Sequence, residues 1–366
     1  MYNRTMSPAI RPWRIFAKGA AIFLAVQFAF LAFHPDLQWL NVYRSSLKRE
    51  RFPTSTVAPA DTALDVENLD AMFASHRVSE PKAANEYRVL VLGDSAVWGI
   101  GLRPQQTLPG QLQALGLTCG GKDVSVYNLS FPRSSAAKDL MILDQAMKYE
   151  PDDIVWLITW YTLMPKTRSD HPLIAQNPAE FYKLAHRFDF LPKNYHSPDL
   201  FTRIRDGNRT LFRILRYQLY SLVEIATGLD QIPGPPEELP AQLSSDQTFE
   251  GMKPPALNPT DISLDQVADF YKIAGSVPVI LINEPMEVLT GVPNSSIRYN
   301  DYYPRWVYDQ YREYASRAAA QNHWDYLDLW NVFPPSYYTD TPLHLIPAGE
   351  TELAKMIAPA ILRGCP

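Results

Sequence analysis

An alternation of two sequence periods between residues 87 and 366 limits the fold of this chain more than any other feature. Short apolar runs of strand length alternate with longer segments whose apolar residues recur every three or four positions. The runs cover 87–92, 124–129, 154–159, 277–282 and 326–330, and the helical segments cover 105–115, 136–149, 302–320 and 347–362. Alternating strands and helices form parallel sheets, because each helix carries the chain back to the start of the next strand. We therefore predict a three-layer α/β/α sandwich around a mainly parallel five-stranded sheet.

The residues between Leu163 and Ser263 interrupt this alternation. Within them, 199–228 has the apolar period of a helix with a basic side. Its arginines are Arg203, Arg205, Arg209, Arg213 and Arg216. We interpret the segment as a packed helical lid; a helix that lies on an anionic membrane surface is the alternative. The predicted organisation is one α/β domain in two parts, 87–164 and 263–366, separated by an insertion at 165–262.

The N-terminus carries a signal for the compartment. Residues 19–33 form an apolar run in which Gln27 is the only strongly polar side chain, and Lys18 precedes the run. As a helix the run spans about 22 Å, against about 30 Å for a bilayer core, unless Lys18 extends toward the interface. We predict an uncleaved transmembrane anchor at 1–43 and a linker at 44–86, with a buried core helix as the alternative. The position of the positive charges favours a body outside the cytoplasm.

Net charge and cysteine content limit the kinds of partner and cofactor that we predict for this chain. The formal net charge is −5 over 366 residues, and no dense run of lysine and arginine follows the N-terminal region, so we predict no nucleic-acid partner. Two cysteines cannot build a cysteine-based zinc site, and His171 and His196 lack metal-ligand spacing, so we assign no metal and no cofactor. Cys119 and Cys365 each follow a predicted helix; a disulfide and two free thiols are equal alternatives.

The stretch RVLVLGDSAVWG runs from the first predicted strand into Gly93, Asp94 and Ser95. In an open parallel sheet the carboxyl ends of the strands border the ligand crevice. Glycine permits a tight exit from the strand, and the aspartate can cap the turn that follows. The turn therefore either aims a serine nucleophile into the crevice or is a helix cap without a catalytic role.

A base for this serine stands near the other end of the chain. The segment YYTDTPLHLIPAG places Asp340 and His344 on a loop between the last predicted strand and the last helix. This loop belongs to the same edge of the sheet as Ser95. A neutral His344 can accept the serine proton while the carboxylate of Asp340 holds the other ring nitrogen.

These segments together resemble the SGNH/GDSL hydrolase superfamily. The resemblance lies in a strand followed by GDS-x-x-x-G and in an Asp/His loop followed by HLIPAG and a C-terminal helix, and it covers 87–164 and 263–366. It implies a flavodoxin-like sandwich, which agrees with the order of elements above, and hydrolysis or transfer of acyl esters. It also implies that Ser95 is the nucleophile, His344 the base and Asp340 the acid that orients the base.

The chain departs from the family pattern in three places. The acid usually stands three residues before the histidine, where this chain has Thr341, whereas Asp340 stands four before it. The second family block usually supplies a glycine N–H to the oxyanion hole; here Ser130 or Arg133 stands in that block, and each keeps a backbone N–H. The third block usually contains G-x-N-D, which is missing here, so that Thr162 is the nearest side-chain donor.

Two further observations complete the candidate site. Loss of one oxyanion donor costs about 3 kcal/mol of transition-state stabilisation, so the missing third block predicts a slow, specialised or inactive site. Asn283 ends the fourth predicted strand and is a candidate for contact with substrate, with loop capping as the alternative.

The leading hypothesis is a membrane-anchored, extracytoplasmic serine esterase or O-acyltransferase that acts on acyl esters of cell-envelope glycans or lipids. The alternative is a non-catalytic binding or assembly module of the envelope that has kept the fold. A flavin- or nucleotide-binding protein is disfavoured, because the loop after the first strand lacks a glycine-rich phosphate cradle. The pattern leaves the acyl acceptor, water or a sugar hydroxyl, and the oligomeric state open.

Overall fold

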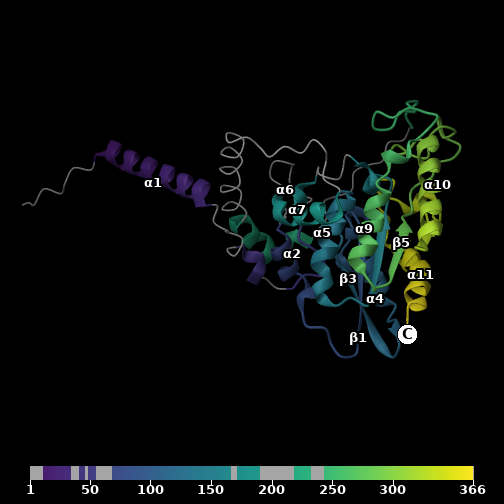
Figure 1. Cartoon of the computed structure of the whole chain (residues 1–366), viewed down its shortest axis with the longest axis horizontal. Coiled ribbons are helices and arrows are strands. Elements are labelled where there is room, and N and C mark those ends of the chain that lie inside the picture. The colour runs from purple at the N-terminus through teal and green to yellow at the C-terminus, as the bar shows by residue number, and fades with distance from the viewer. Residues whose placement is uncertain are drawn as a thin grey trace, which may run out of the picture. The chain divides into compact units, whose positions relative to one another are not determined.

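The computed structural model describes residues 11–33, 41–45, 48–54, 68–165, 171–189, 218–231 and 243–365. The chain divides into two compact units. One unit comprises residues 1–41 and 194–220, and its described part is mainly helix α1 (Pro12–Phe33) (Figure 1). The other comprises residues 42–193 and 221–366 and contains the sheet.

Helix α1 corresponds to the predicted anchor. Among the described residues, however, no helix is both long and apolar enough to cross a membrane. This finding corrects the predicted transmembrane helix. Arg14 and Lys18 lie in the first two turns of α1, and the apolar run that follows Lys18 spans about 22 Å, less than the roughly 30 Å of a bilayer core.

The sheet has six strands in the order β2-β3-β1-β4-β5-β6. Five are mutually parallel and lie at the predicted places: β1 (Glu86–Leu92), β3 (Lys122–Asn128), β4 (Asp153–Ile158), β5 (Val279–Asn283) and β6 (Asp325–Asp328). The sixth, β2 (Thr118–Cys119), pairs antiparallel with β3 and corrects the predicted count of five. Two residues are too few to show a strand period, and the turn into β3 uses Gly120 and Gly121, both at positive φ.

Helices cover both faces of the sheet, as the three-layer prediction requires. Because side chains alternate along a strand, β1 sends Val91 to one face and Leu92 to the other. The face of Val91 packs against α4 (Leu108–Ala114) and α11 (Pro347–Arg363). The opposite face packs against α2 (Leu69–Ser75), α5 (Ala136–Ala146), α9 (Leu264–Ala274) and α10 (Arg305–Asn322).

Short helices connect these elements. Helix α3 (Ser95–Trp98) follows β1, and α6 (Pro172–Gln176) and α7 (Pro178–Phe188) follow β4. Further 3-10 turns lie at Val42–Ser45, Arg77–Ser79, Pro104–Gln106, Met147–Tyr149, Tyr161–Leu163, Leu229–Gln231, Pro259–Asp261 and Pro335–Tyr337. The helices predicted at 105–115 and 136–149 are therefore each an α-helix with an adjoining 3-10 turn.

The described part of 44–86 packs against the domain that contains the sheet. Phe52 contacts Phe73 of α2 edge to face, with 5.0 Å between ring centroids, and both side chains are buried. The guanidinium of Arg51 is also buried and donates to the carbonyl of Trp98 at 2.7 Å. This segment therefore supports the turn that follows β1.

The insertion at 165–262 is described in part. Helix α7 packs on α5, and Nη1 of Arg187 lies 3.1 Å from Oδ1 of Asp144. Most of the segment interpreted as a lid lies outside the described residues. This includes Arg203, Arg205, Arg209, Arg213 and Arg216. The lid therefore stays a prediction.

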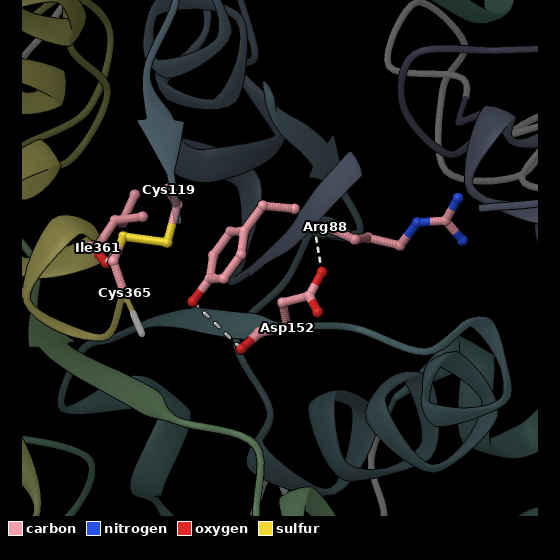
Figure 2. Close-up of a disulfide and its surroundings, with 6 residues drawn as sticks. Arg88, Cys119, Asp152, Ile361 and Cys365 are labelled. Carbon is pink, nitrogen blue, oxygen red and sulfur yellow. Dashed lines mark hydrogen bonds between the residues drawn. A yellow bond between two sulfur atoms is a disulfide. The ribbon is translucent and has the colours of Figure 1, made fainter. Parts of the chain in front are cut away.

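Cys119 and Cys365 form a disulfide, with their Cα atoms 5.2 Å apart (Figure 2). The sequence left a disulfide and two free thiols as equal alternatives, and the structure contains the disulfide. The cysteines meet because α4, which leads into β2, packs beside α11, which ends just before Cys365. Figure 2 places the bond near Arg88 and Asp152, at the edge where the parallel strands begin.

Candidate active site

The turn after β1 places Ser95 at the carboxyl edge of the sheet. Only glycine fits at position 93, because a Cβ on Gly93 would lie 2.5 Å from a side-chain carbon of Val97. Asp94 is buried, and its carboxylate accepts a hydrogen bond from the N–H of Ala96 at 3.0 Å. This side-chain cap starts helix α3 at Ser95, as the GDS motif predicts.

The loop before α11 brings His344 and Asp340 to this serine. Nε2 of His344 lies 3.0 Å from Oγ of Ser95, and Nδ1 lies 2.8 Å from Oδ1 of Asp340. Because a carboxylate only accepts hydrogen bonds, the ring proton belongs on Nδ1, and Nε2 is left to accept the serine hydroxyl. The structure therefore joins the three residues predicted as catalytic in one chain of hydrogen bonds.

The shape of the loop explains how an acid four residues before the histidine reaches the ring. Oγ1 of Thr341 accepts the N–H of Leu343 at 3.2 Å and that of His344 at 3.1 Å. The N–H of Thr339 donates to the carbonyl of His344 at 2.9 Å, and its hydroxyl donates to Oδ1 of Asp340 at 2.8 Å. Thr341 thus tightens the turn, and the carboxylate faces the ring from the neighbouring position.

The electrostatics of the pair keep the acid ionised. The side chains of His344 and Asp340 are only 7% and 11% exposed, so their interaction is little screened by water. Burial raises the pKa of Asp340, but the hydrogen bond and charge of His344, with the hydroxyl of Thr339, outweigh burial and leave the pKa below its ordinary value. The carboxylate therefore remains charged and favours an imidazolium beside it.

The segment after β3 is hydrogen-bonded to the turn that carries Ser95. The N–H of Phe131 donates to the carbonyl of Gly93 at 3.2 Å. Arg133 follows with a φ of 68°, the left-handed region that favours glycine, and its side chain is exposed. The backbone at Arg133 therefore has the shape that glycine allows, although the residue is an arginine.

Lys138, for which no role was predicted, holds this segment through hydrogen bonds to backbone carbonyls. Its Nζ is fully buried and donates to the carbonyls of Gly93 at 2.8 Å and Phe131 at 2.6 Å. Oδ1 of Asp139 lies 3.1 Å from the same nitrogen. One cation thus links the turn of the serine to the segment of Arg133. The only signal in the sequence was a charged side chain on the apolar face of a predicted helix.

His171 holds the same segment from the insertion. Its Nε2 donates to the carbonyl of Pro132 at 3.1 Å, and its Nδ1 accepts the N–H of Leu173 at 3.0 Å. Burial, together with the charge of Lys138, lowers the pKa of His171 to about 3. A neutral ring in this tautomer satisfies both contacts, so His171 acts as a structural clamp.

Thr162 and Asn283, both predicted to contact substrate, are used elsewhere. Oγ1 of Thr162 accepts the N–H of Thr159 at 3.1 Å. Asn283 is fully buried; its Nδ2 donates to Asp328 at 2.8 Å, and its Oδ1 accepts two tyrosine hydroxyls of α10 at 3.3 and 3.1 Å. Within the described ranges neither side chain bonds to the Ser95, His344 and Asp340 triad. Asn283 therefore ties β5 to β6 and α10, and its predicted contact with substrate stays a prediction.

The site combines a serine hydroxyl, an imidazole that can accept its proton and a carboxylate behind the imidazole. This set supports nucleophilic attack on a carbonyl carbon. In the part of the chain that the structure describes, no three His, Cys, Asp or Glu side chains are grouped as metal ligands.

No protein-family model and no curated protein matches the sequence. Among solved structures, a lipase/acylhydrolase from Enterococcus faecalis is 14% identical, with a TM-score of 0.40 over 76% of this chain and 97% of that one. A carbohydrate acetylesterase family member from Sinorhizobium meliloti is 13% identical (TM-score 0.34, 76% and 98% covered), and an M. smegmatis aryl esterase is 12% identical (0.34, 75% and 97%).

Proposed function

We propose that the chain is a serine ester hydrolase or O-acyltransferase with Ser95 as its nucleophile. The observation that carries this proposal is the continuous hydrogen bonding from Ser95 through His344 to Asp340, over distances of 3.0 and 2.8 Å. A serine that only capped a helix would need no imidazole at its hydroxyl. The arrangement instead supplies the base that a weakly nucleophilic hydroxyl requires.

The reaction proceeds in two halves. Oγ of Ser95 bonds to the carbonyl carbon of an ester while Nε2 of His344 takes the hydroxyl proton; the ester C–O bond then breaks, and Nε2 returns the proton to the departing alcohol. In the second half, water or a sugar hydroxyl gives a proton to Nε2 while its oxygen bonds to the acyl carbon; the bond from that carbon to Oγ of Ser95 then breaks, and Nε2 returns the proton to Oγ. Asp340 stays ionised and stabilises the imidazolium in both halves.

Backbone N–H groups are the donors that we propose for the oxyanion. Ser95 is the first residue of α3, so its N–H has no acceptor within the helix. The carboxylate of Asp94 accepts the N–H of Ala96, and not that of Ser95. We assign the second donor to the N–H of Arg133. The amide of Asn283 donates to Asp328, so that side chain does not serve as a third donor; without a third donor the rate is expected to be about 10²- to 10³-fold lower than with one.

The disulfide supports a location outside the cytoplasm, because cytosolic thiols are kept reduced. We therefore propose that the substrate is an acyl ester of a cell-envelope glycan or lipid. Alkylation of the full chain, with and without prior reduction, tests the compartment argument. Two cysteines that react only after reduction support it, and two that react at once in protein from intact cells contradict it.

A fluorophosphonate probe tests the nucleophile directly. The full chain should be labelled at Ser95, which mass spectrometry of the digested protein identifies, and should hydrolyse a short-chain nitrophenyl ester. Ser95→Ala should abolish labelling and lower the rate by at least about 10³-fold. Ser244→Ala, which removes an exposed hydroxyl, is the matched control and should behave as the wild type.

Absence of labelling and turnover in a folded wild-type chain would overturn the proposal. That result would favour the non-catalytic module, for which the bond from the amide of Asn283 to Asp328 is the supporting observation.

A further inference from the structure

A buried carboxyl group that the mechanism above does not use lies next to the active site. Glu284 follows β5 at the carboxyl edge of the sheet, and its N–H donates to the carbonyl of Ile158 at 3.1 Å. The side chain is 2% exposed. Its Oε1 is buried and has no hydrogen-bond partner among the described residues. A polar atom left in this state costs about 1 to 3 kcal/mol, so its presence needs an explanation.

Glu284 lines a small cavity whose walls include the chain neighbours of both reacting residues. Ala96 and Val97 follow Ser95 in the chain, and Leu343 and Leu345 flank His344. The rest of the lining is Leu108, Leu157, Pro285, Glu350 and Leu353. The cavity volume is about 10 Å³, which is room for about one water molecule. A change in the size of this cavity therefore acts on the segments that carry the nucleophile and the base.

The charges that face Glu284 come from every element packed around it. Burial is the largest influence and raises its pKa well above the usual value; the carboxylate of Asp94 and the carboxyl of Glu350 act in the same direction. On α5, Lys138 opposes this rise and Asp139 adds to it. The neighbouring tyrosines are Tyr303, Tyr308 and Tyr338.

Glu350, the second carboxyl of the cavity, is 3% exposed. Burial raises its pKa as well, against a hydrogen bond from the backbone of Leu108. Two carboxyl groups therefore share one small space without a cation in its lining. Such a space tolerates neutral acids and penalises a carboxylate.

We propose that Glu284 works as an uncharged carboxylic acid that positions Ser95 and His344, and that its ionisation in alkaline solution disables the site. A carboxylate at this position needs hydration, and a cavity with room for about one water must open to provide it. Opening moves the segments next to Ser95 and His344, whose hydrogen bond is 3.0 Å long. A displacement of about 1 Å between reacting groups costs about 10²-fold in rate. This inference rests on the proposed function.

The test measures labelling by the fluorophosphonate and ester hydrolysis across a pH series, with the full chain. In the wild type the rate should fall by about tenfold per pH unit on the alkaline side. Glu284→Gln keeps a polar group of the same shape that cannot ionise, so the alkaline fall should disappear. The matched control is Glu350→Gln, which alters the other carboxyl of the cavity and should keep the alkaline fall.

The outcomes separate this inference from the proposed function. A wild type that is not labelled at any pH overturns both. A labelled wild type whose alkaline fall persists in E284Q, or disappears in E350Q instead, overturns the role of Glu284 alone.

A second measurement keeps the inference testable should E284Q fold poorly. Infrared difference spectra of E350Q between successive pH values of the same series show whether a protonated carboxyl other than Glu350 is lost together with activity. Loss of that signal in step with the rate supports the role of Glu284. Loss of the rate with no change in the carboxyl region overturns it.

Discussion

The two edges of the sheet are held together by different kinds of bond. At the carboxyl edge, hydrogen bonds from buried Lys138 and His171 fix the segments around Ser95. At the opposite edge one covalent bond ties Cys119 to Cys365. Helix α11 connects the two edges, because it begins just after the loop of His344 and ends just before Cys365. The candidate catalytic residues therefore lie at one edge of the sheet, and the covalent crosslink lies at the other.

The largest expected effect is on kcat and comes from a substitution at the carboxyl edge. Asp340→Asn keeps the shape of the loop but removes the charge that orients His344 and stabilises its protonated form, so kcat should fall about 10³- to 10⁴-fold with little change in thermal stability. Steady-state kinetics and a melting curve measure both quantities. Asp123→Asn, at the start of β3 on the other edge, is the control and should leave kcat unchanged. A D340N rate within tenfold of wild type would contradict the assignment.

Removal of the disulfide at the opposite edge should lower stability and leave the rate nearly unchanged. Replacing both cysteines by serine should lower the free energy of unfolding by about 2 to 5 kcal/mol, because the bridge closes a loop of 246 residues in the unfolded chain. The esterase rate at room temperature should change little. Urea unfolding of the variant, and of reduced wild type as an independent comparison, measures the loss. Equal unfolding midpoints for oxidised and reduced protein would be evidence against this role.

Acid tests the same comparison, because it acts on two buried histidines and not on the disulfide. One is His171; the other is His76, whose ring bonds to the backbone of Glu50 and Val78 at 3.0 Å each. Burial lowers the pKa of His76 and His171 from 6.5 to about 3. Below pH 6.5 these histidines bind protons in the unfolded chain but stay neutral in the folded chain. The free energy of unfolding therefore falls as pH falls, and it continues to fall down to about pH 3. Each histidine contributes about 1.4 kcal/mol per pH unit in this window.

Denaturant unfolding between pH 7 and 4 checks this slope. His171→Gln should reduce the slope by the share of one histidine, about 1.4 kcal/mol per pH unit. His186→Gln, which alters an exposed histidine of α7, should not change it. The same slope in wild type and His171→Gln would show that the ring is not kept neutral by burial.

The smallest expected effect lies in the backbone next to the serine. Arg133→Gly should raise the free energy of unfolding by roughly 0.5 kcal/mol, because glycine relieves the positive φ but also gains freedom in the unfolded chain. Arg133→Ala keeps the unfavourable φ and should bring no gain. Melting curves of the two variants distinguish them, and greater stability in the alanine variant would contradict the argument.

Most of the parallel sheet was predictable, because a strand buried on both faces is apolar throughout. The apolar run of β1 and the polar residues Gly93, Asp94 and Ser95 that end it are visible in the sequence. Strand β2 was not visible, since two residues show no period. The predicted transmembrane helix was not found, because no helix among the described residues is both long and apolar enough to cross a membrane.

The contacts of buried polar side chains were much less predictable. Lys138 and His171 bind backbone carbonyls, and because every residue carries a carbonyl, the sequence contains no pattern that marks the partner. Asn283 was assigned to substrate, yet its amide meets Asp328 and two tyrosines that lie far away in the chain. The same amide suits either role, and only the packing of α10 decides between them.

The hydroxyl of Ser95 and the imidazole of His344 are 249 positions apart in the chain, and the two sulfur atoms are 246 positions apart. During synthesis the nucleophile is therefore made well before its base. A product that ends between the two positions holds Ser95 without the imidazole that takes its proton.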